Sequence, residues 1–380
     1  MSLIIAEIGT SHEGSLEKAK LLVDAAADSG ADAVKFQWVY ADEILHPKTG
    51  FVALPTGNIP LYERFRQLEC PVDFYRQMVD YVHSKGCKFC CSPFGLRSLK
   101  ELLSLKPDIL KVASPELNHY PMLKEIARYR KEQSANGEQP VPVVLSSGVS
   151  KFEDIKKAVD IVGMDGVSLL HCITSYPAPE SEYNLKVIGT LKNNFGIECG
   201  VSDHSLDPIL VPSLSIACGG TVIEKHITLS RQTMGLDDPV ALEPEQFALM
   251  VHTVHQTEAT FRHYGAEVGM QRTIDQLSEQ FGLYKVIAVM GNGIKKLAPA
   301  EEANYGRTNR SLHYMRNLKK GQVIGEGDIA VLRTEKVLSP GISPEFLDDV
   351  IGKTLACDVE DGAGVEFIHI CGLPRPSGSQ

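Results

Sequence analysis

Hydrophobic and polar positions follow a repeating order along roughly the first 265 residues: a short apolar run, then a longer segment with helical spacing. The apolar runs are rich in Val, Ile and Leu, which is typical of parallel strands buried on both faces. The eight expected strands are Leu3–Ile8, Ala33–Gln37, Lys88–Ser92, Ile109–Ala113, Val141–Ser147, Val167–Cys172, Glu198–Ser202 and Val222–His226.

A segment with helical periodicity follows each run. The clearest is Leu16–Ser29, whose apolar residues share one face and which Gly30 follows as a stop signal. The others are Val72–Ser84, Leu96–Leu105, Tyr120–Glu132, Lys151–Val162, Leu185–Phe195, Ile209–Cys218 and Glu245–Tyr264. Eight β–α units of this length predict an α/β protein with a (β/α)8 TIM barrel. A doubly wound sheet is the alternative, but it usually has fewer strands and an early G-x-G-x-x-G fingerprint, which Gly9 and Gly14 do not fit.

The pattern changes after the last of these units. We expect a TIM-barrel catalytic domain over residues 1–270, a linker over 271–306 and a small β-rich module over 307–372. The module is suggested by short apolar runs separated by tight turns such as Lys319-Lys320-Gly321. Residues 373–380 are rich in Pro, Gly and Ser, and we expect a disordered tail there.

Composition narrows the class of function. The chain has 38 Lys and Arg against 48 Asp and Glu, a net charge of −10, which argues against nucleic acid as a partner. A few focused lysines can still hold a small anion. No apolar stretch reaches about 18 residues, so no membrane span is expected. The N-terminus lacks the features of a signal peptide, and nine cysteines, two of them adjacent in an apolar run, indicate reduced thiols in the cytoplasm.

Polar residues end most of the expected strands, where the active site of such a barrel lies. A polar group in an apolar strand is costly unless it is paired or used. Lys35 and Gln37 share one strand face, and Lys111 ends another strand. Two lysines and several hydroxyl groups on one rim suit a ligand with a phosphate and a carboxylate. The alternatives are a salt bridge for Lys35 and helix capping for each serine taken alone.

Two histidines end neighbouring strands of the closed barrel. His204 and His226 together can bind one divalent ion and leave positions open for water and substrate. For either one alone, a hydrogen-bonded core histidine is the alternative. His171 lies within an apolar run, and we interpret it as structural.

These residues resemble the sialic acid synthase family, which includes N-acetylneuraminate and spore coat polysaccharide synthases. The motifs that carry the resemblance are Ala6-Glu7-Ile8-Gly9, Ala33-Val34-Lys35-Phe36-Gln37, Ser92-Pro93-Phe94, Lys111 to Glu116, Leu145-Ser146-Ser147-Gly148, Tyr176-Pro177, Ser202-Asp203-His204-Ser205 and Glu224-Lys225-His226. The C-terminal module resembles the family's antifreeze-like (SAF) domain through Asn309-Arg310-Ser311-Leu312.

The resemblance implies a reaction: metal-dependent condensation of phosphoenolpyruvate with an N-acetylated amino-sugar aldehyde, such as N-acetylmannosamine. The products are a nine-carbon 2-keto sugar acid and phosphate, formed by C–O cleavage. By similarity, the residues that hold phosphoenolpyruvate are Lys35, Ser92, Lys111, Ser114 and Ser146. Those at the sugar are Gln37, Thr174, Tyr176 and Asp237, where Thr174 replaces an Asn common in the family.

The resemblance also assigns catalytic, metal and partner roles. Glu116 is the expected acid/base, Glu7 a second carboxylate near the metal, and His204 with His226 the ligands of Mn²⁺ or Mg²⁺. In the family a homodimer exchanges the SAF domain, and an arginine reaches the sugar of the partner. The candidates here are Arg310 and Arg333. The sugar stays open among N-acetylmannosamine, its 6-phosphate and 2,4-diacetamido-6-deoxyhexoses.

Two other functions remain as alternatives. A Schiff-base aldolase of the same fold would use Lys111 or Lys35 as the nucleophile, and would not need the histidine pair. A non-catalytic sugar-binding homologue is the second alternative, and the retained lysines, Glu116 and histidines argue against it.

Overall fold

The structure is a computed structural model that describes residues 1–54, 57–233 and 235–375. Eight parallel strands close into a barrel in the order β1-β10-β9-β8-β7-β6-β5-β2. The strands are β1 (Leu3–Gly9), β2 (Ala33–Trp38), β5 (Lys88–Pro93), β6 (Ile109–Val112), β7 (Val143–Ser146), β8 (Val167–Cys172), β9 (Glu198–Asp203) and β10 (Val222–His226). All eight expected strands are present, and none of their ends differs from the expectation by more than two residues.

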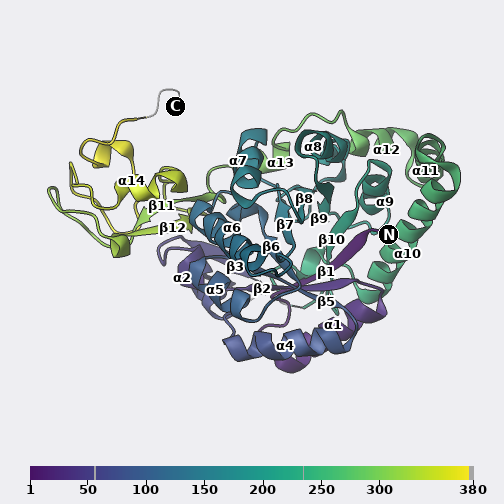
Figure 1. Cartoon of the computed structure of the whole chain (residues 1–380), viewed down its shortest axis with the longest axis horizontal. Helices are drawn as coiled ribbons and strands as arrows, with labels where there is room; N and C mark the ends of the chain where they lie inside the picture. Colours follow the sequence, from purple (N-terminus) through teal and green to yellow (C-terminus); the bar gives the residue numbers. More distant parts are fainter. Residues whose placement is uncertain (55–56, 234, 376–380) are drawn as a thin grey trace.

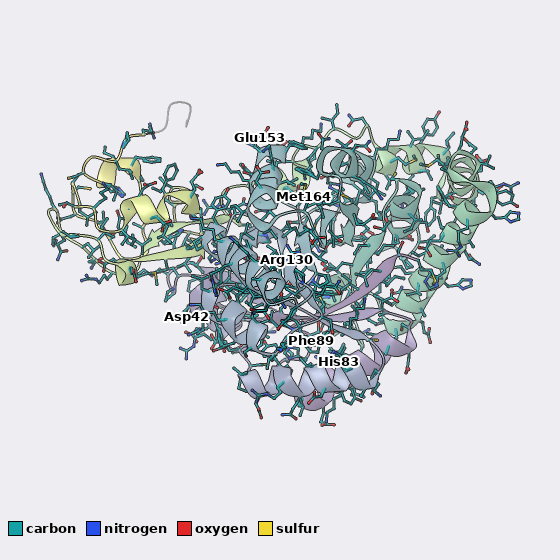
Figure 2. The ribbon with its side chains drawn as sticks, viewed as in Figure 1. Asp42, His83, Phe89, Arg130, Glu153 and Met164 are labelled. Carbon is teal, nitrogen blue, oxygen red and sulfur yellow. The ribbon has the colours of Figure 1, made fainter. Side chains whose placement is uncertain are left out.

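Helices cover the outside of the barrel (Figure 1). They are α1 (Leu16–Asp28), α4 (Val72–Ser84), α5 (Leu96–Ser104), α6 (Tyr120–Ala135), α7 (Phe152–Val162), α8 (Val187–Phe195), α9 (Leu210–Ala217) and α10 (Pro244–Tyr264). Their apolar faces pack on the outward side chains of the strands in one core. A buried arginine, Arg130 of α6 (Figure 2), donates hydrogen bonds to the carbonyl groups of Val141 and Val162, and so ties α6 to the neighbouring β–α unit.

The inside of the barrel has two layers, because inward-facing residues recur at every second position of a strand. Each strand supplies one inward residue to a lower layer and a second one, two positions later, to an upper layer nearer its C-terminal end. The pairs are Ile5 and Glu7, Ala33 and Lys35, Cys90 and Ser92, Ile109 and Lys111, Val144 and Ser146, Leu170 and Cys172, Gly200 and Ser202, and Val222 and Glu224. The lower layer is apolar and the upper layer is mostly polar or charged, so the strand ends present a polar floor.

The segment between β2 and α4 departs from the simple β–α repeat. It contains α2 (Ala41–Ile44), the hairpin β3 (Phe51–Leu54) and β4 (Gly57–Pro60), and α3 (Leu61–Arg66), none of which the sequence pattern predicted. Ile44 and Leu45 join a small apolar cluster with Phe94 at the barrel rim. Leu45 also pairs with Arg333 of the C-terminal module, so this insertion forms part of the docking surface for the module.

The region expected to be a linker over 271–306 is largely helical. Helix α11 (Ala266–Phe281) crosses the expected boundary at residue 270, and α12 (Leu283–Met290) follows it. Leu277 of α11 and Val286 of α12 are buried in the barrel's own core. Helices α11 and α12 therefore belong to the outer layer of the barrel, and the connection to the module runs from Gly291 through α13 (Pro299–Glu302).

The C-terminal module is built on an antiparallel pair, β11 (Arg310–Tyr314) and β12 (Ile329–Arg333), with the short helix α14 (Leu347–Val350). It has a separate apolar core, against which Leu373 packs. Asn118 of the barrel exchanges two hydrogen bonds with the backbone of Arg310, at 2.8 and 2.9 Å, which docks the module on the same chain's barrel. Residues 376–380 of the expected tail lie outside the described residues.

Among the described residues, no helix combines the length and the apolar character needed to cross a membrane.

The module contains a buried histidine that should make its stability depend on pH. His313 is fully buried; burial lowers its pKa to about 4, although the carbonyl of Gly362 opposes the shift. The folded pKa lies below the unfolded value, so the unfolded chain takes up a proton first and stability falls as pH drops from about 6.5 towards 4. The free energy of unfolding, measured with urea, should fall between pH 7 and pH 5 by about 2 kcal/mol more in the native protein than in the His313→Gln variant. Equal losses would contradict this.

Candidate active site

Four buried charges form the centre of the polar layer. The ammonium group of Lys35 lies 2.5 Å from Glu7 Oε2 and 3.7 Å from Glu224 Oε2, and Lys111 Nζ lies 3.8 Å from the same oxygen of Glu224. All four side chains are almost fully buried. Two ammonium groups and two carboxylates therefore neutralise one another in the mouth of the barrel.

Hydroxyl and amide groups complete this cluster. Lys111 Nζ donates to Ser146 Oγ at 2.7 Å, and Lys35 Nζ donates to Ser92 Oγ at 3.3 Å. Each lysine thus keeps a hydroxyl partner on the strand next to its own. On the carboxylate side, Glu7 accepts from Gln37 Nε2 at 2.8 Å and Glu224 accepts from Ser202 Oγ at 2.9 Å.

Burial and the neighbouring charges shift these pKa values in different directions. Burial raises the pKa of Glu7, and Lys35 only partly opposes the shift. Burial also lowers the pKa of Lys111, assisted by the positive charge of Lys35. For Lys35 burial again favours the neutral form, but Glu224 and Glu7 outweigh it and raise the pKa. An anion that enters beside Lys111 therefore meets a lysine whose charge is not yet fully balanced, which favours binding.

Two adjoining cavities open above the cluster. The inner one, of about 50 Å³, is lined by both lysines and by Ser114, Ser146, His204 and His226. The outer one, of about 290 Å³, lies between the barrel and the module and is lined by Thr174, Asp237 and Arg333. Gln37 and Tyr176 line both cavities. The inner cavity is on the scale of one anionic group, and the outer one has room for a larger polar molecule.

The two predicted metal ligands face each other across the inner cavity. The ring centroids of His204 and His226 are 5.5 Å apart, a separation that an ion about 2.1 Å from each nitrogen can bridge. His204 Nδ1 donates to the carbonyl of Ile173 at 2.8 Å, which leaves Nε2 as the ligand atom.

The protonation of the two imidazoles differs. Burial lowers the pKa of His226 well below its usual value, so that ring is neutral and ready to bind an ion. Burial also opposes charging of His204, but Cys172 and the Ile173 carbonyl outweigh it and raise the pKa to about 9. An ion binding at His204 would displace a proton.

No cluster of three or more His, Cys, Asp or Glu side chains arranged for a metal occurs in residues 1–54, 57–233 and 235–375. The two imidazoles alone would supply two ligand nitrogens.

A second buried ion pair supports His204 from behind. Lys225 Nζ lies 2.6 Å from Asp203 Oδ2, and both side chains are fully buried on the outer face of their strands. Tyr183 donates its hydroxyl proton to Asp203 Oδ1 at 2.7 Å and accepts from the backbone N–H of His204 at 2.7 Å. This network fixes the backbone that carries His204.

Glu116, the expected acid/base, lines neither of the two cavities. It is fully buried, and its Oε1 accepts hydrogen bonds from Arg310 and Arg333 at 2.9 and 2.7 Å. Arg310 also donates to the carbonyl groups of Phe94 and Glu43 and lines neither cavity. Arg333 retains some exposure, and its guanidinium group lies 5.3 Å from the centre of the Phe94 ring in the outer cavity. Of the two candidate arginines, only Arg333 faces the site.

The family model described as NeuB matches residues 22–264, and an SAF domain model matches residues 309–367. The chain belongs to the NeuB family. This NeuB-family chain is 31% identical to the N,N′-diacetyllegionaminic acid synthase of Campylobacter jejuni, over 93% of this chain and 96% of that protein. It is 29% identical to the spore coat polysaccharide biosynthesis protein SpsE of Bacillus subtilis, over 91% of this chain and 87% of that protein.

The crystal structure of the Bacillus subtilis SpsE protein resembles the NeuB-family chain with a TM-score of 0.76 at 28% identity, covering 97% of this chain and 95% of that one. The predicted family, the predicted barrel followed by an SAF domain, and the prediction that the chain is an enzyme of this family are confirmed.

The site of this NeuB-family chain includes side chains that the sequence analysis did not select. Glu224, Ser202 and Cys172 line the inner cavity with the predicted residues. The signal was present in the sequence, because each lies at the same inward position of its strand as Lys35 and Lys111 do in theirs. The position of Glu116 had no such signal, since its partners come from the module.

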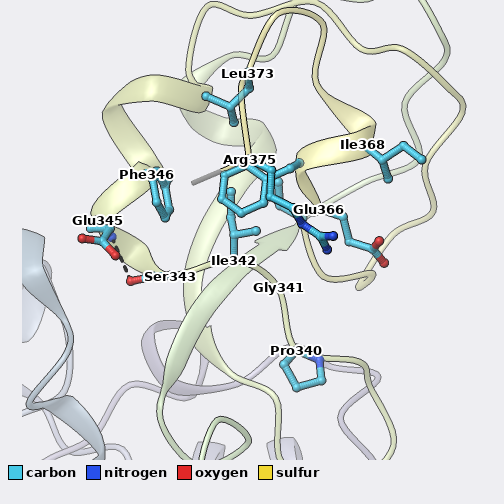
Figure 3. A pocket seen from close by; sticks show the side chains of 12 residues that line it. Pro340, Gly341, Ile342, Ser343, Glu345, Phe346, Glu366, Ile368, Leu373 and Arg375 are labelled. Carbon is cyan, nitrogen blue, oxygen red and sulfur yellow. Dashed lines mark hydrogen bonds between the residues drawn. The ribbon is translucent and has the colours of Figure 1, made fainter. Parts of the chain in front are cut away.

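The largest cavity described is elsewhere, in the SAF module of the NeuB-family chain. It has about 1080 Å³, and Figure 3 shows Ile342, Phe346 and Leu373 around it. None of the predicted site residues lines it. We therefore place the active site at the barrel mouth, where the charged groups converge.

The Asp203–Lys225 pair predicts a stability difference. Asp203→Asn should lower the free energy of unfolding by about 3–5 kcal/mol, because it leaves the buried Lys225 charge without a counter-ion. As a control, Asp160→Asn breaks the exposed pair with Lys156 and should cost no more than about 0.5 kcal/mol. Urea unfolding at pH 7 compares the two variants. Similar losses in both would show that the buried pair contributes little.

Proposed function

We propose that this chain condenses phosphoenolpyruvate with the open-chain aldehyde of an N-acetylated amino sugar. The products are a nine-carbon 2-keto sugar acid and inorganic phosphate. The observation that carries the proposal is the inner cavity, where the ammonium groups of Lys35 and Lys111 meet the hydroxyls of Ser114 and Ser146. The names of the relatives, which are legionaminic, pseudaminic and sialic acid 9-phosphate synthases, support the same reaction class.

Phosphoenolpyruvate fits the charge pattern of the inner cavity. Its phosphate and carboxylate need fixed positive charge and several hydrogen-bond donors. Lys111 and Ser146 lie 2.7 Å apart, so one anionic group can contact both. In a buried site, an anion beside Lys111 gains more Coulomb energy than it would in water.

The reaction needs a C–C bond, a water molecule and a proton. The enol carbon C3 of phosphoenolpyruvate attacks the aldehyde carbon, and water adds to C2, which has become electron-poor. The C2–O bond to phosphate then breaks, which leaves a 2-keto group and releases phosphate; the two protons that the water loses on becoming the keto oxygen end on the alkoxide and on the departing phosphate. The growing alkoxide takes up a proton. Of the two carboxyl groups that line the inner cavity, Glu7 has a raised pKa and Glu224 a lowered one, so Glu7 is the one suited to donate that proton. Glu116, held by two arginines, positions Arg333 instead.

The sugar is expected in the outer cavity. Tyr176 and Gln37 lie at the boundary with the inner cavity, where the aldehyde must meet the enol carbon. Thr174, Asp237 and Arg333 line the outer part and can bind hydroxyl and acetamido groups. Arg333 brings the SAF module into the site.

We propose that the reaction also needs a divalent ion, Mn²⁺ or Mg²⁺. His204 and His226 would hold it through one ring nitrogen each. When bound, such an ion polarises a carbonyl oxygen as a Lewis acid.

We also propose that the enzyme is a cytoplasmic homodimer that exchanges its SAF modules. In a single chain the module docks on its own barrel, and an exchanged module would make the same contacts with the partner's barrel. The bonds of Arg333 to Glu116 are therefore common to both arrangements.

Phosphate release from phosphoenolpyruvate tests the reaction. The purified protein, freed of metal with a chelator, is assayed with N-acetylmannosamine, its 6-phosphate and 2,4-diacetamido-6-deoxyhexoses, with and without added Mn²⁺. We expect release with one class of sugar, only after metal is restored. His204→Ala should lose at least about 100-fold in rate and also bind less Mn²⁺ in equilibrium dialysis, because one of two ligands is gone. His252→Ala, at an exposed histidine of α10, serves as the control.

The alternatives predict other results. Covalent trapping with borohydride and pyruvate, together with indifference to chelation, would indicate a Schiff-base aldolase. No release with any sugar would indicate a sugar-binding protein.

Arg333 should act on sugar binding. Arg333→Ala should raise KM for the sugar about 10-fold or more, since charge-assisted hydrogen bonds contribute about 1.5–3 kcal/mol. KM for phosphoenolpyruvate should change little. Arg316→Ala removes an exposed arginine of the same module and should be neutral. Unchanged sugar KM in Arg333→Ala would place the sugar elsewhere.

The same variant tests module exchange. Lys111→Met and Arg333→Ala chains are unfolded together and refolded as a mixture. The assay uses a sugar concentration well below the native KM, where Arg333→Ala alone keeps only about a tenth of native activity. With exchanged modules, mixed dimers contain one native site, and about a quarter of the native activity should return. No recovery would mean that each module serves its own barrel.

A further inference from the structure

A buried carboxylate in the connection between barrel and module contacts the active-site rim. Glu301 of α13 is 1% exposed. Its Oε1 accepts hydrogen bonds from the backbone N–H groups of Val149 and Thr174, both at 2.7 Å. Its Oε2 accepts from Ala298 N at 3.2 Å, within its own segment. One oxygen of Glu301 thus serves the connection, and the other serves two loops that follow strands β7 and β8.

The first of these loops is held in an unfavourable backbone conformation. Val149 has φ of +43°, in the left-handed region that β-branched residues rarely adopt. Its N–H is bonded to Glu301, and its carbonyl oxygen accepts from Asn309 Nδ2 at 3.0 Å. The N–H of this strained residue is therefore bound by the connection, and its carbonyl group by Asn309 at the start of the SAF module. Such conformations persist only when the surroundings over-determine them.

The two loops also pack tightly against each other within the site. Gly148 N donates to Ser114 Oγ at 3.0 Å, and a Cβ at Gly148 would lie 2.1 Å from Thr174 Oγ1. Ser114 and Ser146 line the inner cavity, and Thr174 lines the outer one. A small displacement of either loop would therefore move groups in both cavities.

We propose that Glu301 is a positioning residue that holds the Ser146–Val149 and Thr174–Tyr176 loops in register. An ionised carboxylate suits this role because it accepts from two N–H groups at once and binds them more strongly than a neutral acceptor does. A residue that only capped the start of α13 would need no more than the hydrogen bond of Oε2 with Ala298. The two hydrogen bonds of Oε1 with Val149 and Thr174 at the rim of the site are not explained by capping. The inference rests on the proposed function only for its kinetic readout.

Three variants separate positioning from general stability. Glu301→Ala removes both rim hydrogen bonds, Glu301→Gln retains an oxygen that can accept them, and Glu302→Ala changes the exposed neighbour. Glu301→Ala should raise KM for both phosphoenolpyruvate and the sugar at least about 10-fold, as both loops move. Glu301→Gln should stay within about fivefold of native kcat/KM, and Glu302→Ala should equal the native protein. A loss of folded protein alone would lower kcat and leave both KM values unchanged, which would overturn the proposal.

Hydrogen–deuterium exchange provides a readout that does not need turnover. Peptides that span residues 147–151 and 172–176 should exchange at least about 10-fold faster in Glu301→Ala, while peptides from β1 and β10 stay at the native rate. Native exchange in both loops would overturn the proposal, as would faster exchange with unchanged KM values. If the native protein shows no turnover with any sugar, the proposed reaction fails and the exchange rates alone decide whether Glu301 holds the loops.

Discussion

Two ammonium groups buried in the mouth of a barrel are the constraint on which the rest of the site depends. Lys35 and Lys111 are almost entirely excluded from solvent, and an unpaired charge there would be very unfavourable. Glu7 and Glu224 provide the compensating charge, and the lysines also donate hydrogen bonds to serine hydroxyls and, from Lys111, to the carbonyl group of Val112. The strand ends can be polar because the layer below them, with Ile5 and its neighbours, is apolar and closes the barrel. The charged cluster is thus available to a ligand from one side.

The surrounding structure keeps this cluster in place with further buried charges. Behind it, Lys225 and Asp203 support the backbone of His204. On the side of the SAF module, Glu116 accepts hydrogen bonds from Arg310 and Arg333 of the module. Each of these buried charges would be destabilising without its partner, and the partners of Glu116 lie 194 and 217 residues further along the chain. The arrangement therefore links the position of the SAF module to the geometry of the outer cavity.

The periodicity of the chain was sufficient to predict the barrel. Short Val- and Ile-rich runs, separated by amphipathic segments, have few other solutions, so the eight strands and their helices agree closely with expectation. Lys35 and Lys111 were found because a charged residue in such a run is conspicuous. Helices α11 and α12 were not predicted, because the many polar residues of α11 weaken its helical pattern and α12 is only a short apolar segment of 8 residues between two glycines. The placement of Glu116 was not predictable, since it depends on two arginines 194 and 217 residues away that local sequence does not connect to it.

The central claim is that Lys111 and its neighbours form an anion site specific for phosphoenolpyruvate. Isothermal titration of phosphoenolpyruvate into the native protein, without sugar, measures this directly, with Lys111→Met and the exposed Lys156→Met as the compared variants. The account predicts binding to the native protein and to Lys156→Met, and an affinity at least about 100-fold weaker in Lys111→Met. Equal affinity in all three proteins would contradict it.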